Sequence, residues 1–235
     1  MDQATTIDKV GFFHFVERHD RPIWELRKAL QSRSAHEDTS GSLIVLPEAF
    51  NIKKRYKESG PADHSRAVLD DLGALCVRFR VTMVAALIVN EVWSPCLSYS
   101  SAYWVGEGRP VRICRKRCRD GNEANTPYRR CRHDPDDRNP FRHGDACIIA
   151  LICEDSDDSV RKQKLLDRCE GSRTIICIPA CMASPSGRQA ITLNWAPYEV
   201  ILANSEPCGI GSFIGKRGSI VVARESSEGN AVVLV

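Results

Sequence analysis

The sequence predicts an α/β protein in which mixed β-sheets are covered by helices. Short apolar runs alternate with stretches whose apolar residues recur at helical spacing, as Val68, Leu72, Leu75 and Phe79 do. Glycine-containing segments such as "GEGR" and "KRGS" separate neighbouring strand candidates, which indicates hairpins beside the β-α-β crossovers. Strands joined in both ways favour a mixed sheet system with helices on its faces.

The expected elements follow one another along the whole chain. A first strand at 10–15 precedes a helix that begins at Pro22, because proline is favoured in the first helical turn. Ile23, Leu26 and Leu30 would share one face of that helix. Two more helices are expected at 62–80 and about 159–170. The other strands are expected at 42–48, 81–89, 97–105, 110–116, 148–153, 174–180, 199–205, in a hairpin over 212–223, and at 231–235.

The bulk composition indicates one soluble domain that spans residues 1–235. The 235 residues are 43% hydrophobic and 27% charged, which is ordinary for a globular protein. No uncharged apolar run approaches the roughly 18 residues that span a bilayer. The start, "MDQATTIDKV", lacks the features of a secretory signal, so we expect a cytoplasmic protein. In such a protein the eleven cysteines are expected to be reduced.

Residues 117–143 form a long polar segment that we expect to be a loop. It is rich in Gly, Asn, Pro and Asp, and loops of such length in compact domains are usually functional or disordered. The overlapping stretch 109–138 holds ten Lys/Arg and five Asp/Glu, a local charge of +5 within a chain of net charge +3. This excess indicates either a solvated loop or a surface for an anionic partner.

Three expected strands end on a residue that is unusual for its setting. "LIVLPE" ends at Glu48, "VRICRK" at Lys116 and "IIALIC" at Cys153. Strand ends hold side chains rigidly while they still reach open space, so sites gather there. A thiol with an unperturbed pKa of about 8.5 must lose its proton before it attacks a carbonyl or a nitrile. Glu48 is the candidate base for that proton.

The other parts of an acyl-transfer site can be assigned in the same way. Lys116 is the candidate cation that stabilises the negative charge developing on the substrate. The backbone N–H of Glu154, directly after the thiol, is a natural second oxyanion donor. The acids after Cys153 also suit a helix start, where Ser156 or Asp158 can serve as the N-cap.

These motifs, taken in order, resemble those of the carbon–nitrogen hydrolase (nitrilase) superfamily. "LIVLPEAF" resembles the family's strand before its base glutamate, "RKRCRDGNE" its lysine motif, and "IIALICED" its nucleophile motif. Downstream, "IICIPACMAS", "VILANS" and "GSFIGKRGSIVVA" are similar to the strands and hairpin that follow in that family. The resemblance covers residues 10–235.

The resemblance implies a four-layer α-β-β-α sandwich and a cysteine-dependent hydrolase of non-peptide C–N bonds. Cys153 would be the nucleophile, Glu48 the general base and Lys116 the stabilising cation, while Glu123 would match the family's second glutamate. The reaction would pass through a thioester acyl-enzyme on a small amide, ω-amide or carbamoyl compound, with a nitrile less favoured. The family needs no metal or organic cofactor, and homodimers are typical of it, so a homodimer stays open here.

Two other functions are compatible with the residues. One is a nitrilase-like fold without activity, kept as a binding or scaffold protein. The other is a zinc or nucleic-acid-binding module in segment 109–147, although nucleic acid is disfavoured because Tyr128 is the only aromatic residue between 109 and 138. The residues that would bind zinc are Cys114, Cys118, Cys131, His133, His143 and Cys147.

Overall fold

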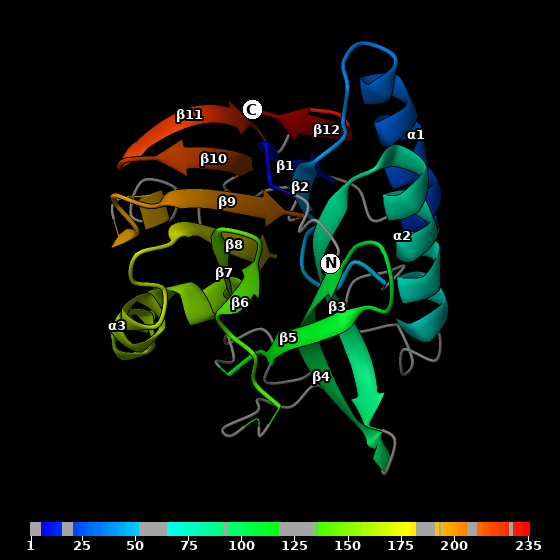
Figure 1. Cartoon of the computed structure of the whole chain (residues 1–235). Helices are drawn as coiled ribbons and strands as arrows, with labels where there is room; N and C mark the ends of the chain where they lie inside the picture. The colour runs from blue at the N-terminus through cyan, green and yellow to red at the C-terminus, as the bar shows by residue number, and fades with distance from the viewer. Residues whose placement is uncertain are drawn as a thin grey trace.

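A computed structural model places most of the chain in two stacked sheets with helices outside them (Figure 1). The residues it describes are 6–15, 21–51, 65–91, 94–117, 134, 136–181, 191–192, 194–205, 211–225 and 228–235.

The first sheet, called sheet A here, contains six strands in the order β12-β1-β2-β3-β4-β5. Its middle strands β1, β2 and β3 are parallel, and the outer strands β12, β4 and β5 pair antiparallel. The sheet is therefore mixed, as expected. The strands are β1 (Lys9–His14), β2 (Ser42–Val45), β3 (Thr82–Glu91), β4 (Ser94–Val105), β5 (Val111–Arg115) and β12 (Ala231–Leu234).

The second sheet, called sheet B here, has the order β11-β10-β9-β8-β7-β6. It repeats the plan of sheet A, because β7, β8 and β9 are parallel while β6, β10 and β11 pair antiparallel. The strands are β6 (Phe141–His143), β7 (Ala146–Ala150), β8 (Arg173–Ala180), β9 (Glu199–Asn204), β10 (Ser212–Lys216) and β11 (Ser219–Arg224).

Three apolar clusters separate four layers. Helices α1 (Pro22–Ser34) and α2 (Ser65–Phe79) pack on the outer face of sheet A, with Leu26 and Leu75 in that cluster. Helix α3 (Ser159–Asp167) packs on sheet B through Leu165. The third cluster lies between the sheets and takes side chains from both. The predicted α-β-β-α sandwich is therefore confirmed, and Figure 1 shows the helices on opposite outer sides.

All three strands expected to end on site residues end earlier than predicted. β2 ends at Val45 and β7 at Ala150, so Glu48 and Cys153 each lie three residues beyond a strand. Lys116 directly follows β5. The predicted loop 117–143 also needs correction, because its last three residues form edge strand β6. The turns that follow the strands, and not the strands themselves, therefore carry the glutamate and the cysteine.

The prediction that the cysteines are reduced is wrong for one pair. Cys147 in β7 is bonded to Cys169, which follows α3. The bond joins the strand that leads to Cys153 to the far end of the next helix. Among the described residues no helix is long and apolar enough to span a membrane.

Candidate active site

Glu48 lies in a turn that faces the opposite sheet. Its backbone N–H donates to the carbonyl of Ala180, the last residue of β8, at 3.3 Å. Its side chain is 1% exposed and accepts hydrogen bonds from Lys116 Nζ at 3.1 and 3.3 Å and from Ser100 Oγ at 2.9 Å. Burying a carboxylate is costly unless donors surround it, and these three hydrogen bonds fix the orientation of the Glu48 side chain.

Lys116 is positioned by the same neighbour that contacts Glu48. The Lys116 N–H donates to the Ser100 carbonyl at 2.8 Å, while the Ser100 hydroxyl donates to Glu48. The lysine side chain is 3% exposed and lies against the carboxylate. The sequence analysis missed Ser100, since a serine within an alternating strand such as "LSYSSAYWV" carries no local sign of this role.

Cys153 begins a short 3-10 helix, Cys153–Asp157, and has a φ of 53°. Left-handed backbone is uncommon for residues other than glycine and is concentrated at functional sites, where the surrounding structure enforces it. The residue is 1% exposed. The chain therefore turns sharply after β7 and directs the thiol into the space between the sheets, where Cys153 belongs to the inter-sheet cluster.

The surroundings of Cys153 favour the protonated thiol. Burial raises its pKa well above the usual value, and the negative charge of Glu48 raises it further. The charge of Lys116 and a hydrogen bond from the backbone N–H of Cys181 lower the pKa, but by less. The thiol therefore needs a base close by, and Glu48 is near enough for its charge to act on the sulfur.

Cys181 is a neighbour that the sequence analysis did not identify. It directly follows β8, which runs parallel to β7 with Ala150 opposite Cys177. Parallel neighbours end at the same edge of a sheet, so the residues after β7 and β8 meet there. The sequence signal was available, because "IICIPAC" is an apolar strand candidate that ends on a thiol.

The remaining predicted residues have different outcomes. Glu123 lies outside the described residues. Glu154 is the second residue of the 3-10 helix, and its role as an oxyanion donor stays a prediction. Of the two candidate caps, Asp158 is the N-cap of α3, and it accepts the N–H of Arg161 at 3.0 Å.

The described residues give no support to the zinc alternative. Within them no three His, Cys, Asp or Glu side chains are close enough to hold a metal ion. Cys147 is used in the disulfide, and the Cys114 thiol donates to the Ala150 carbonyl. Cys118, Cys131 and His133 lie outside the described residues.

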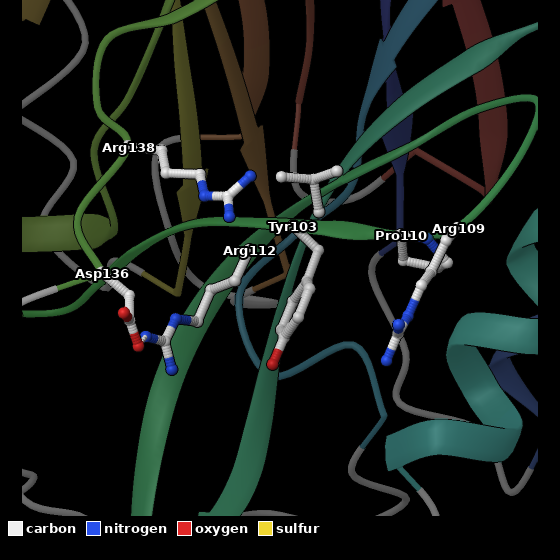
Figure 2. Close-up of a pocket in the computed structure, with 7 residues that line it drawn as sticks. Tyr103, Arg109, Pro110, Arg112, Asp136 and Arg138 are labelled. Carbon is white, nitrogen blue, oxygen red and sulfur yellow. Dashed lines mark hydrogen bonds and ion pairs between the residues drawn. The ribbon is translucent and has the colours of Figure 1, made fainter.

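A hollow of about 470 Å³ opens at the β5 edge of sheet A (Figure 2). Its lining does not include Glu48, Lys116 or Cys153, so the hollow is distinct from the candidate site. Arg112, one of three arginines there, already pairs with Asp134 and Asp136. The lining residues are Tyr103, Arg109, Pro110, Val111, Arg112, Asp136 and Arg138.

Comparisons with known proteins find similarity in structure but not in sequence. No family model and no curated protein matches the chain. Solved structures of an amidase from Nesterenkonia sp. do match. One has 15% identity over 98% of this chain and 90% of that chain, with a TM-score of 0.76.

Two further structures of the amidase from Nesterenkonia sp. AN1 match equally well. A cysteine-to-serine variant, described as an amidase from the nitrilase superfamily, has 15% identity over 99% of this chain and 92% of that chain, with a TM-score of 0.76. A glutamate-to-glutamine variant with acrylamide added to its active-site cysteine has 15% identity over 97% and 92%, with a TM-score of 0.75. At this identity the likeness concerns the fold: the chain has the α-β-β-α fold of nitrilase-superfamily amidases.

Proposed function

We propose that the protein is a cysteine-dependent hydrolase that cleaves the C–N bond of small amides. The observation that carries this proposal is the buried Glu48–Lys116 ion pair, whose two charges both act on the Cys153 thiol. A base, a cation and a thiol on which both of their charges act are the groups that acyl transfer from an amide requires.

The first half of the reaction forms a thioester. Glu48 removes the proton from Cys153 Sγ, and the thiolate attacks the amide carbonyl carbon. Lys116 Nζ stabilises the resulting oxyanion, together with backbone N–H groups at the turn, such as that of Glu154. When the tetrahedral intermediate collapses, protonated Glu48 returns its proton to the nitrogen, the C–N bond breaks and ammonia leaves.

The second half of the reaction restores the thiol. Glu48 takes a proton from water, whose oxygen attacks the thioester carbon while Lys116 again stabilises the oxyanion. The C–S bond breaks, the acid product leaves, and the proton held by Glu48 returns to Cys153 Sγ. Each proton taken up by the carboxylate is given back, so one base serves both halves.

The similar amidase supports this chemistry. Its active-site cysteine takes up acrylamide by Michael addition and the acetamide moiety of fluoroacetamide. Both additions are seen in a variant of that amidase in which one glutamate is replaced by glutamine. The close burial of Cys153 favours a small substrate here as well, and among amides, ω-amides and carbamoyl compounds we favour a small primary amide.

The test combines labelling with turnover. Fluoroacetamide is incubated with the wild type, with Cys153→Ala and with Cys177→Ala, a control that removes another buried thiol from the neighbouring strand β8. We expect one acetamide group on Cys153 in the wild type and in the control, and none at the other thiols. Release of ammonia from acetamide, glutaramate, N-carbamoylglycine and acetonitrile is then measured for the same proteins.

Activity that is lost only with Cys153→Ala supports the proposal, and the substrate that is turned over identifies the class. Labelling spread evenly over the thiols, with no ammonia from any of the four compounds, contradicts it. The fold would then be that of a binding or scaffold protein, and the basic segment 109–147 would be the region to examine for a partner.

A further inference from the structure

We propose that Asp155 is a positioning residue that holds Lys116 and Cys153 in register across the two sheets. The inference rests on the proposed function, because it concerns the same site. It starts from a geometric requirement: Lys116 follows β5 of sheet A, whereas Cys153 follows β7 of sheet B. The apolar cluster between the sheets is non-directional and does not by itself fix their register.

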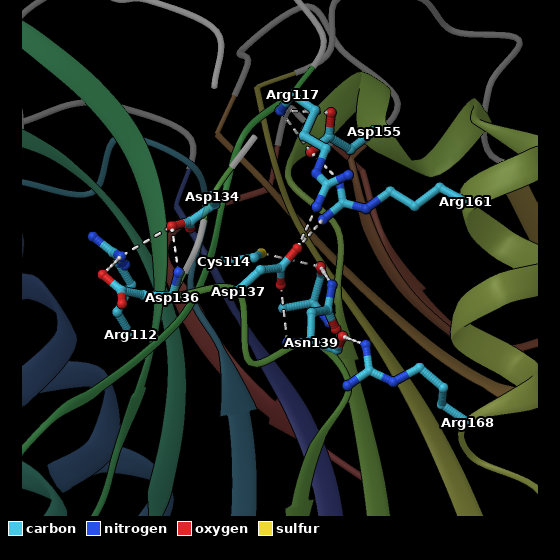
Figure 3. Close-up of polar contacts among 11 residues, drawn as sticks. Arg112, Cys114, Arg117, Asp134, Asp136, Asp137, Asn139, Asp155, Arg161 and Arg168 are labelled. Carbon is cyan, nitrogen blue, oxygen red and sulfur yellow. Dashed lines mark hydrogen bonds and ion pairs between the residues drawn. The ribbon is translucent and has the colours of Figure 1, made fainter. Parts of the chain in front are cut away.

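Asp155 makes a direct polar link between the two catalytic segments. It lies two residues after Cys153 within the same 3-10 helix, and its side chain is 0% exposed. Both of its carboxylate oxygens accept the backbone N–H of Arg117, each at 3.0 Å. Since Arg117 follows Lys116 directly, the carboxylate ties the nucleophile turn to the end of the lysine strand (Figure 3).

The backbone at the end of β5 is also held by a hydrogen bond to β4. The Lys116 N–H donates to the Ser100 carbonyl of β4, so two successive N–H groups at the end of β5 point to different anchors. One anchor belongs to sheet A and the other to the nucleophile turn. This arrangement fixes the backbone from which the lysine side chain reaches Glu48.

The buried Asp155 carboxylate lies within a cluster of charged side chains. Arg161 Nη1 of α3 donates to Asp155 Oδ2 at 2.8 Å, and Arg161 is itself 7% exposed. Asp137 pairs with the Arg117 guanidinium and lies 4.0 Å from Arg161. The positive charges of Arg117 and Arg161 thus balance the negative charges of Asp137 and Asp155. Figure 3 shows the four side chains converging near the start of α3.

The acids after Cys153 therefore have two separate roles. Asp158 caps α3, as the sequence indicated, whereas Asp155 reaches back to β5. Helix capping needs an acceptor at only one of these positions, so a capping role does not account for the burial and the contacts of Asp155.

The experiment compares Asp155→Asn with Asp134→Asn in the full chain. The control removes a buried carboxylate that pairs with Arg112, and none of its hydrogen bonds or ion pairs within the described part of the chain reaches residue 117 or the turn after β7. Asp155→Asn retains one oxygen acceptor but turns an amide group toward the Arg117 N–H or Arg161. We expect kcat for the best small amide to fall about 100-fold, since displacing a catalytic group by about 1 Å has that effect, while KM changes little.

The second readout does not depend on turnover. The rate at which iodoacetamide alkylates Cys153 is followed against pH by peptide mass spectrometry. Displacing Lys116 weakens a charge that lowers the thiol's pKa, so the midpoint should move to higher pH. Loss of the Asp155 negative charge alone would move the midpoint the other way. The direction therefore separates positioning from simple electrostatics, and Asp134→Asn should leave kcat and midpoint unchanged.

Each outcome decides one of the two proposals. Wild-type protein that never turns over an amide contradicts the proposed function, yet the alkylation midpoint still tests the link. A kcat within about threefold of wild type, or an unchanged or lower midpoint in Asp155→Asn, overturns the positioning role. If Asp155→Asn does not fold, Arg161→Lys replaces it, because lysine keeps the positive charge but holds the Asp155 carboxylate less firmly. This variant should lower kcat and raise the alkylation midpoint, as expected for Asp155→Asn. No change in either measurement overturns the positioning role.

Discussion

At the scale of single residues, Cys153 responds to two opposite charges that also bind each other. Glu48 raises the pKa of the thiol and Lys116 lowers it, and the carboxylate and ammonium are 3.1 Å apart. Substituting Glu48 removes the charge that raises the thiol's pKa, and substituting Lys116 removes the charge that lowers it. The two substitutions should therefore move the reactivity of the thiol in opposite directions.

Glu48→Gln should separate reactivity from turnover. Ammonia release should fall by roughly 10²–10⁴-fold because the general base is lost. The midpoint pH for alkylation of Cys153 should nevertheless move down, because the lysine charge then acts on the thiol without the opposing carboxylate. Site-resolved mass spectrometry over a pH series that extends into the alkaline range measures the midpoint. A midpoint that stays or rises would show that Glu48 does not act on the thiol.

Lys116→Met is the matched opposite case. Without the ammonium, the Glu48 charge and burial both favour the protonated thiol, so the alkylation midpoint should move up. Turnover should also be lost, because the oxyanion has lost its cation. The same alkylation series measures the effect, and a downward shift would contradict this assignment of charges.

At the scale of elements, two asparagines replace missing strand neighbours beside the site. Asn139 brackets Ala150 at the end of β7, donating to its carbonyl at 2.7 Å and accepting its N–H at 3.1 Å. Asn51 does the same for Ile88 of β3, at 2.8 and 2.9 Å. Each side-chain amide therefore satisfies backbone groups where a neighbouring strand has stopped.

Asn139→Ala and Asn51→Ala should each destabilise the protein by on the order of 2–4 kcal/mol. Either change leaves an N–H and a carbonyl without these partners, and an unsatisfied buried group costs about 1–3 kcal/mol. Asn139→Ala should have the smaller effect, because the Cys114 thiol still donates to the Ala150 carbonyl. Urea unfolding of both variants measures this, and a loss below about 1 kcal/mol in either would refute the bracketing role.

At the scale of the whole molecule, buried thiols in separate layers make stability depend on pH. Burial raises the pKa of Cys76, between α2 and sheet A, to about 12, and that of Cys114, between the sheets, also to about 12. In the unfolded chain these thiols ionise near pH 9, while in the fold they remain protonated. Above pH 9 the unfolded state binds fewer protons, so stability is retained below that pH and falls as pH rises toward 12.

Cys76→Ala tests this dependence away from the candidate site. Each thiol that ionises only on unfolding lowers the free energy of unfolding by about 1.4 kcal/mol per pH unit. The variant should be less stable than wild type near pH 8, because it loses a buried side chain, but its stability should fall less steeply above pH 9. Urea unfolding at intervals from pH 8 to 10.5 gives both slopes, and parallel slopes would contradict the shifted pKa.

The local pattern of the sequence determined most of the elements and pointed to three candidate site residues. Apolar periods of about two and 3.6 residues depend only on near neighbours, so the helices and strands follow from them. Glu48, Lys116 and Cys153 stood out because each is a reactive group at the end of an apolar run. The contacts that join them were not readable, since Lys116 and Glu48 are 68 residues apart in sequence.

Only the tertiary structure decided how these residues are held. Ser100 reaches Glu48 across 52 positions, and Asp155 reaches Arg117 across 38. The Cys147–Cys169 bond and the early end of β7 likewise depend on which segments pack together. Local preference determines whether a segment becomes a helix or a strand. Burial and hydrogen bonding between distant segments determine where a carboxylate or a thiol lies. The pairing of distant segments cannot be read from the local sequence pattern.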